Sequence, residues 1–297
     1  MHKFSLNMWQ FYLVLILLIG CSKKDSEPII TPPVVDQTTF TNPLLNSGPD
    51  PSVIYHDSFY YYTHTLGDKI GLWRTRDITN LKNAEYRTIW LPPAGTAHSY
   101  NLWAPELAFI NNNWYVYYAA DDGKNENHRL YVLENTSSDP FEGRFFFKSK
   151  LETEQWAIDG SVFEHNGINY LVWSGWREPR VSTEIQRLYI AKLDNPWTVG
   201  SKRVQLSEPE LVWEKNWQNP AAWNNTPPYT VYVNEGPQFL KHDNQLFIIY
   251  SASGCWTPQY GLGMLRTSAT NTNLLDSTIW IKSQTPVFQQ STTSGVY

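Results

Sequence analysis

Three acidic residues recur at one position of a pattern that repeats along the chain. The pattern begins at Asp50, Ala104, Asp159 and Glu235, and a short apolar run follows each of these residues. A single acid before a strand is usually a turn or cap residue. If the repeated units are related by rotation about an axis, however, the three carboxylates meet at one mouth of a central channel. Three acids at one phase of a repeat therefore indicate a shared site.

Carboxyl groups gathered in this way have a definite chemistry. They repel one another, and partial burial disfavours their charged forms, so at least one pKa should rise. A carboxyl that keeps its proton beside one that has lost it supplies a general acid and a general base. Cleavage of a glycosidic bond needs such a pair, at roughly 6.5–9.5 Å for inversion of configuration or roughly 5–5.5 Å for retention. The sequence does not yield this separation.

Each start of the pattern opens a predicted β-hairpin that is followed by a third apolar strand. The hairpins are expected over residues 50–62, 104–118, 159–173 and 235–250, and the third strands near 72–73, 130–133, 188–191 and 262–265. The first three starts lie at near-equal intervals. The fourth comes later, which predicts an insertion near Ser201–Thr230.

Antiparallel units of about 50 residues are typical of a β-propeller. We therefore predict an all-β fold. A β-sandwich would also be rich in strands, but it would not place a matched motif at near-equal intervals. The aromatic content of 15% suits β-strands and surfaces that stack on sugars. The charged content of 17% argues against disorder, and a net charge of −5 without a basic cluster excludes a nucleic-acid footprint.

Four short motifs carry a resemblance to a known family. They are Asp50-Pro51-Ser52-Val53, Trp103-Ala104-Pro105-Glu106, Ile158-Asp159-Gly160-Ser161-Val162-Phe163 and Asn234-Glu235-Gly236-Pro237. In order and phase they are similar to the motifs of glycoside hydrolase family 43. The resemblance implies a five-bladed β-propeller over residues 46–297 that inverts configuration at arabinose- or xylose-containing glycans.

The resemblance also implies a role for each site residue. Asp50 would be the general base that activates water, Glu235 the general acid, and Asp159 the charge that raises the pKa of the acid. Trp103 would form an apolar wall of the sugar pocket, with inter-blade packing as the alternative. Separately from the resemblance, Trp176 lies in a loop after a second strand, where it would line an outer subsite or pack to shield the core from solvent. No zinc-type motif is present and no cofactor is required. A structural cation at the propeller axis is conceivable, but the histidine segment that commonly helps to hold it is absent.

The N-terminus indicates a targeting segment. Residues 1–20 contain an apolar run, Phe11–Ile19, that is too short to span a membrane. The sequence Leu18-Ile19-Gly20-Cys21, at the end of this segment and the start of the next, resembles a bacterial lipobox. An ordinary signal peptide is the alternative. We expect cleavage before Cys21, lipidation of its thiol, a polar and Pro-rich tether over residues 21–45, and a location in the cell envelope, periplasmic or at the cell surface. Membrane contact would then be made through the lipid alone.

Four repeats are about one blade fewer than the resemblance implies. Gly295-Val296-Tyr297 resembles the opening of a last blade, so we expect a chain truncated at its C-terminus. The leading hypothesis is exo-release of α-L-arabinofuranosyl residues from plant cell-wall polysaccharides. A β-xylosidase of the same family, a glycan-binding propeller without turnover, and a degenerate product without a stable fold are the alternatives.

Overall fold

β-Strands supply nearly all the regular structure, so the all-β prediction is confirmed. The computed structural model describes residues 39–179, 184–216 and 231–294. Its helical segments are short 3₁₀ turns: η1 (Ile78–Asn83), η2 (Asn125–Asn127), η3 (Val212–Lys215), η4 (Ser277–Ile279) and η5 (Thr292–Ser294). Within these ranges, no helix has the length and apolar character needed to cross a membrane.

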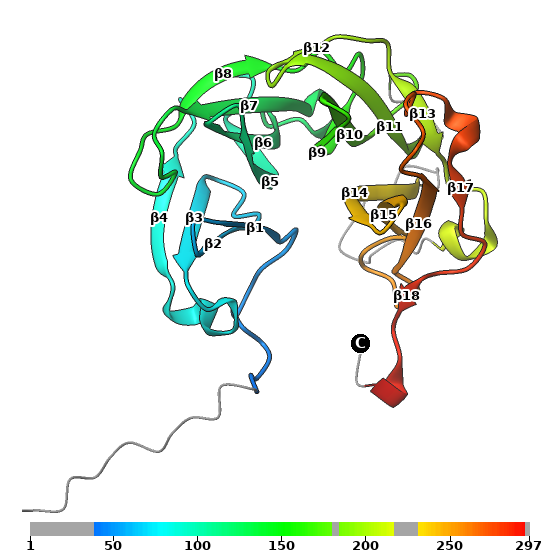
Figure 1. The fold of residues 1–297 in the computed structure, drawn as a ribbon, viewed down its shortest axis with the longest axis horizontal. Coiled ribbons are helices and arrows are strands. Elements are labelled where there is room, and N and C mark those ends of the chain that lie inside the picture. Colours follow the sequence, from blue (N-terminus) through cyan, green and yellow to red (C-terminus); the bar gives the residue numbers. More distant parts are fainter. Residues whose placement is uncertain (1–38, 180–183, 217–230, 295–297) are drawn as a thin grey trace, which may run out of the picture. The chain divides into compact units, whose positions relative to one another are not determined.

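The strands form four antiparallel groups, called blades 1 to 4 here (Figure 1). Blade 1 holds β1 (Ser52–His56), β2 (Phe59–Thr63), β3 (Ile70–Thr75) and β4 (Glu85–Trp90). Blade 2 holds β5 (Tyr100–Ile110), β6 (Asn113–Asp121), β7 (Arg129–Asn135) and β8 (Phe146–Lys150). Blade 3 holds β9 (Ala157–His165), β10 (Ile168–Gly175), β11 (Glu184–Asn195), β12 (Thr198–Val199) and β13 (Val204–Ser207). Blade 4 holds β14 (Val231–His242), β15 (Gln245–Ala252), β16 (Gly261–Ser268), β17 (Ile281–Lys282) and β18 (Phe288–Gln289).

The predicted hairpins are the first two strands of each blade. In each hairpin a short polar turn reverses the chain, and the predicted third strand pairs next to it. Part of the predicted insertion is regular structure, because Val204–Ser207 is the outer strand β13 of blade 3. Blades 3 and 4 are also joined directly, since Glu184–Gln186 of β11 pairs in parallel with Val231–Val233 of β14.

Three apolar cores lie between successive blades. Strand β6 shows why: alternate side chains of a strand point to opposite faces, and both of its faces are buried. Trp114, Val116 and Tyr118 belong to the core shared with blade 1, whereas Tyr115 and Tyr117 belong to the core shared with blade 3. A third core joins blades 3 and 4. Stacking of blades therefore fixes where each first strand lies.

The first strand of each blade contacts the first strand of the next. Strand β1 contacts β5, β5 contacts β9, and β9 contacts β14. Figure 1 shows these four strands nearest the centre of the blade arrangement, with the outer strands β4, β8 and β13 away from it. The residues that open the first strands are thereby brought together. The count of five blades stays a prediction.

Candidate active site

A β-bulge recurs within the first strand of blades 2, 3 and 4. Each bulge sets two residues opposite one: Ala104–Pro105 opposite Tyr118, Asp159–Gly160 opposite Trp173, and Gly236–Pro237 opposite Tyr250. The first residue of each pair has a positive φ, of 43°, 55° and 57° respectively. Asp50, which precedes β1, has a φ of 53°. This left-handed conformation is uncommon outside glycine, and its recurrence at equivalent positions shows that the four blades share one backbone geometry here.

The bulges correct the predicted alignment of the acids. Asp50 and Asp159 share their backbone position with Gly236, so Glu235 lies one residue earlier, at the position of Trp103 and Ile158. The prediction that all three acids occupy one position is therefore wrong for Glu235. Glycine adopts a positive φ without a steric cost, so in blade 4 it takes the bulge position and the residue before it carries the carboxyl.

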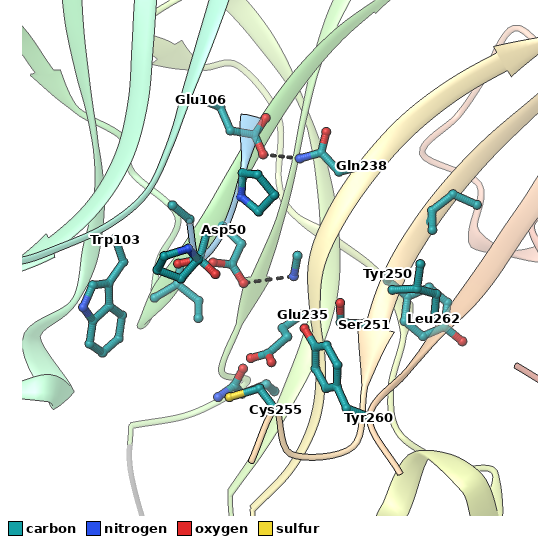
Figure 2. Close-up of a pocket in the computed structure, with 18 of the residues that line it drawn as sticks. Asp50, Trp103, Glu106, Glu235, Gln238, Tyr250, Ser251, Cys255, Tyr260 and Leu262 are labelled. Carbon is teal, nitrogen blue, oxygen red and sulfur yellow. Dashed lines mark hydrogen bonds between the residues drawn. The ribbon is translucent and has the colours of Figure 1, made fainter. Parts of the chain in front are cut away.

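The three carboxyls nevertheless line one cavity of about 840 Å³. Figure 2 shows Asp50 and Glu235 facing the same space, with Trp103 on one side and Cys255 and Tyr260 on the other. Asp159 lines the same cavity and accepts a hydrogen bond of 2.9 Å from the backbone N–H of Gly236. This bond ties the carboxyl of blade 3 to the residue that follows Glu235.

The surroundings of Glu235 favour its protonated form. Burial, and then the negative charges of Asp159 and Asp50, raise the pKa of Glu235 to about 8. Burial and the charge of Asp50 also raise the pKa of Asp159 above its ordinary value, against the hydrogen bond from Gly236. Glu235 and Asp159 together therefore retain a proton near neutral pH, which is the condition for general-acid catalysis.

Asp50 lies in a more open part of the cavity. Its side chain is solvent-exposed, and its Oδ2 accepts a hydrogen bond of 2.5 Å from the hydroxyl of Thr65. That hydroxyl accepts in turn from the backbone N–H of Ala104, at 2.7 Å. Thr65 therefore fixes the orientation of Asp50 relative to blade 2 while leaving the carboxyl open to water.

A fourth carboxyl, Glu106, lies in the same cavity and was missed as a site residue. Burial raises the pKa of Glu106 to about 8, although hydrogen bonds with Ser161 and Gln238 act in the opposite direction. Gln238 donates to Glu106 (Figure 2). Glu106, Ser161 and Gln238 occupy equivalent positions directly after the bulges. The signal was present, because Glu106 closes one of the four motifs.

The two predicted sugar-binding tryptophans both line the cavity. Trp103 is half-buried and stacks on His128 at 4.1 Å between ring centroids. Trp176 is 3% exposed and stacks on Trp156 at 4.5 Å with an interplanar angle of 7°. Both rings therefore combine packing with a face toward the cavity, and their role in sugar binding stays a prediction.

The structure also bears on the predicted cation and lipidation sites. In residues 39–179, 184–216 and 231–294, no group of three or more His, Cys, Asp or Glu side chains is placed to hold a metal ion. Cys21, the predicted lipidation site, lies outside the described residues.

Comparison with known proteins identifies the family. The model of glycosyl hydrolases family 43 matches residues 40–297. The chain belongs to this family. An α-L-arabinofuranosidase from Lactobacillus brevis has a similar crystal structure, with 34% identity and a TM-score of 0.75 over 86% of this chain and 78% of that one. A thermostable family-43 glycoside hydrolase, at 22% identity and a TM-score of 0.64, shares the fold.

Two proteins from Streptomyces are similar to this chain in sequence. The "Extracellular exo-alpha-(1->5)-L-arabinofuranosidase" of Streptomyces avermitilis is 36% identical over 90% of this chain and 53% of its own length. The protein of the same name from Streptomyces chartreusis is 34% identical over 87% of this chain and 75% of its own length. The chain thus spans about half the length of the first of these relatives.

Proposed function

We propose that this family 43 member is an exo-α-L-arabinofuranosidase that hydrolyses with inversion of configuration. The observation that carries the proposal is the gathering of Asp50, Asp159 and Glu235 in one cavity, with Glu235 in the surroundings that keep it protonated. The sugar is inferred from relatives at 34% and 36% identity, whose names give the α-(1→5)-linked arabinofuranosyl residue.

In the proposed reaction Glu235 and Asp50 act on opposite faces of the sugar. Glu235 donates its proton to the glycosidic oxygen as the bond from that oxygen to the anomeric carbon breaks. Water attacks the same carbon from the opposite face and passes a proton to Asp50. Asp159 keeps the proton on Glu235 through its charge and holds Gly236 in place. The products are free arabinose and the shortened glycan.

The cavity walls support a sugar as the ligand. The rings of Trp103 and Trp176 line the cavity together with Tyr260. Aromatic faces bury the apolar C–H face of a sugar, while carboxyl groups bind its hydroxyls. We propose that the terminal arabinofuranosyl residue of an arabinose-containing polysaccharide occupies this space.

We also propose that the protein works outside the cytoplasm. Both Streptomyces relatives are named as extracellular, and the segment before Cys21 is similar to a lipobox. Metabolic labelling of expressing cells with a clickable fatty acid tests the anchor. Label that is lost in Cys21→Ala supports lipidation, and label absent from the wild type contradicts it.

The activity is tested on the full chain with aryl glycosides. We expect hydrolysis of 4-nitrophenyl α-L-arabinofuranoside, and release of arabinose alone from linear α-(1→5)-arabinan. Proton NMR of the first product, before mutarotation, should show the β-anomer. Preferred cleavage of the β-D-xylopyranoside would replace the proposed sugar by xylose. Glycan binding that survives Glu235→Gln, without cleavage by the parent, would instead indicate a binding protein.

A further inference from the structure

A buried carboxylate outside the cavity has no part in the reaction described above. Glu214 lies in η3, and its side chain is 0% exposed. An isolated charge at such a place would be strongly destabilising, so a buried carboxylate must be compensated by a counter-ion and by hydrogen bonds. The groups that bind the Glu214 carboxylate therefore show which parts of the structure it holds in place.

Every partner of Glu214 is close and well defined. Its Oε1 accepts from Asn234 Nδ2 at 3.1 Å, the Tyr250 hydroxyl at 2.9 Å and Lys282 Nζ at 2.8 Å, and its Oε2 accepts from Lys282 Nζ at 2.9 Å and the backbone N–H groups of Glu210 and Leu211 at 3.0 and 2.9 Å. Burial by itself would raise the pKa of Glu214. The hydrogen bonds from Lys282 and Leu211 nevertheless hold that pKa below its ordinary value, so the group is ionised near neutral pH.

The partners adjoin the proposed proton donor on two strands. Asn234 directly precedes Glu235 in β14. Tyr250 directly precedes Ser251, the residue of β15 that pairs with Glu235. Figure 2 shows Tyr250 and Ser251 on the strand beside Glu235. The carboxylate of Glu214 therefore binds one residue beside the donor on its own strand, β14, and one on the paired strand, β15.

Asn234 is held from further directions as well. It is 0% exposed, and its carbonyl accepts from the Ser174 hydroxyl at 3.0 Å. Its Oδ1 accepts from the Ser207 hydroxyl at 2.7 Å. With the bond to Glu214, the residue before Glu235 is tied to blade 3 and to η3, and little rotation of the chain is possible there.

The same 3₁₀ turn supports the cavity wall. The carbonyl of Trp213 accepts from the Ser253 hydroxyl at 2.7 Å, and the carbonyl of Asn216 accepts from the N–H of Gly254 at 3.0 Å. Residues 253 and 254 lead into the loop that brings Cys255 and Tyr260 to the cavity. The segment that carries the Glu214 carboxylate thus also holds the start of this loop.

We propose that Glu214, with Lys282 as its counter-ion, is a positioning residue for the proton donor Glu235. The inference rests on the proposed function, because it assigns the donor role to Glu235. Proton transfer requires the donor within hydrogen-bond reach of the leaving oxygen, and a displacement of about 1 Å can cost about 100-fold in rate. A fixed Asn234 and Tyr250 keep the Glu235 backbone at that place.

The dependence on the leaving group separates positioning from mere stability. A poor leaving group such as methanol must be protonated as it departs, whereas 4-nitrophenolate departs with little help from an acid. We measure kcat of the full chain on methyl and 4-nitrophenyl α-L-arabinofuranoside. Glu214→Gln should lower kcat on the methyl glycoside by about 10- to 100-fold and on the nitrophenyl glycoside by about 3-fold or less.

A matched control breaks an ion pair elsewhere. Arg74 lies 2.7 Å from Asp139, away from the carboxyl cavity. Asp139→Asn should lower Tm but leave the ratio of the two kcat values as in the wild type. The same unchanged ratio in a folded Glu214→Gln would overturn the inference.

A second variant decides the matter if Glu214→Gln does not fold. Lys282→Arg keeps the positive charge but changes its geometry. It should shift the ratio in the same direction, by about 3-fold or more. An unchanged ratio in this variant overturns the inference. A wild type that cleaves neither arabinoside would instead contradict the proposed function, and the two failures are thus distinguishable.

Discussion

The two carboxyls proposed to act in catalysis, Glu235 and Asp50, are held in the cavity in opposite ways. Glu235 lies within strand β14, backed by Asn234 and the buried Glu214, and its surroundings raise its pKa. Asp50 precedes β1, is exposed, and is oriented by the hydroxyl of Thr65. Glu235 is therefore partly buried and its neighbours are fixed by hydrogen bonds, whereas Asp50 is exposed to water.

This difference supports the roles proposed for the two carboxyls. A proton donor needs surroundings that penalise its charged form, while a base that activates water must be reached by water. The side chains are both carboxyls, so chemistry alone does not distinguish them. Their surroundings distinguish them, because burial and neighbouring charges act on Glu235 whereas Asp50 is exposed to water.

The largest effect should come from removing either carboxyl. Asp50→Asn and Glu235→Gln should each lower kcat on methyl α-L-arabinofuranoside by about 10³- to 10⁴-fold. On the 4-nitrophenyl glycoside, kcat of Glu235→Gln should be close to that of the wild type, because this leaving group needs little protonation. Asp50→Asn should not recover. Steady-state kinetics on both substrates checks this, and equal recovery by the two variants would contradict the assignment of roles.

A smaller effect should follow from removing the charge beside the acid. Asp159→Asn should lower kcat by about 100-fold. Because the charge of Asp159 raises the pKa of Glu235, the loss of activity at high pH should move to lower pH in this variant. Glu106→Gln is the control, because it removes a carboxyl from the same cavity that is not among the charges raising the pKa of Glu235. If Asp159→Asn lost activity at the same high pH as the wild type, the proposed effect of the Asp159 charge on the pKa of Glu235 would be refuted.

A still smaller effect should come from removing the hydroxyl that orients Asp50. Thr65→Val keeps the shape of the side chain but removes the hydroxyl that links Asp50 to the N–H of Ala104. We expect kcat to fall by about 10-fold on both arabinosides, because the base is oriented less well but is still present. Thr63→Val, which removes a bond to Gly71 in blade 1, is the matched control and should leave kcat near the wild-type value.

The smallest effect concerns stability. Glu235 has a pKa of about 8 in the folded protein, against about 4.3 in an unfolded chain, so the folded state binds the proton more tightly. Its carboxyl therefore lowers the free energy of unfolding as the pH rises from about 4 to about 8. Glu235→Gln should raise Tm by about 2–6 °C at pH 8 and leave it unchanged near pH 4. Calorimetry at the two pH values checks this, and a gain of equal size at both would be inconsistent with it.

The strands were predictable because their signals are local. Turns such as Asn166–Gly167 and Asp243–Asn244 lie between apolar runs, and the structure places a reversal at each. The position of Glu235 was predicted one residue wrongly, because a bulge changes which residues are equivalent without changing the order of the motif. Gly236, with its positive φ, was the available signal.

The supporting residues could not be predicted in the same way. Thr65 reaches Asp50 from 15 residues away, and Lys282 reaches Glu214 from 68 residues away. Such contacts follow from the packing of blades, and no short motif records them. Glu106 differs, because it closes a motif, so its acidic side chain was a local signal from which it could have been predicted.

Carbon-13 NMR of the full chain labelled at the glutamate side-chain carboxyls tests the assignment of the acid most directly. The signal absent from Glu235→Gln identifies Glu235, and its shift is followed as a function of pH. We predict an apparent pKa of about 8 in the wild type and a lower value in Asp159→Asn. Titration of the wild-type signal near 4.3, the ordinary value for glutamate, would contradict the role of Glu235 as proton donor.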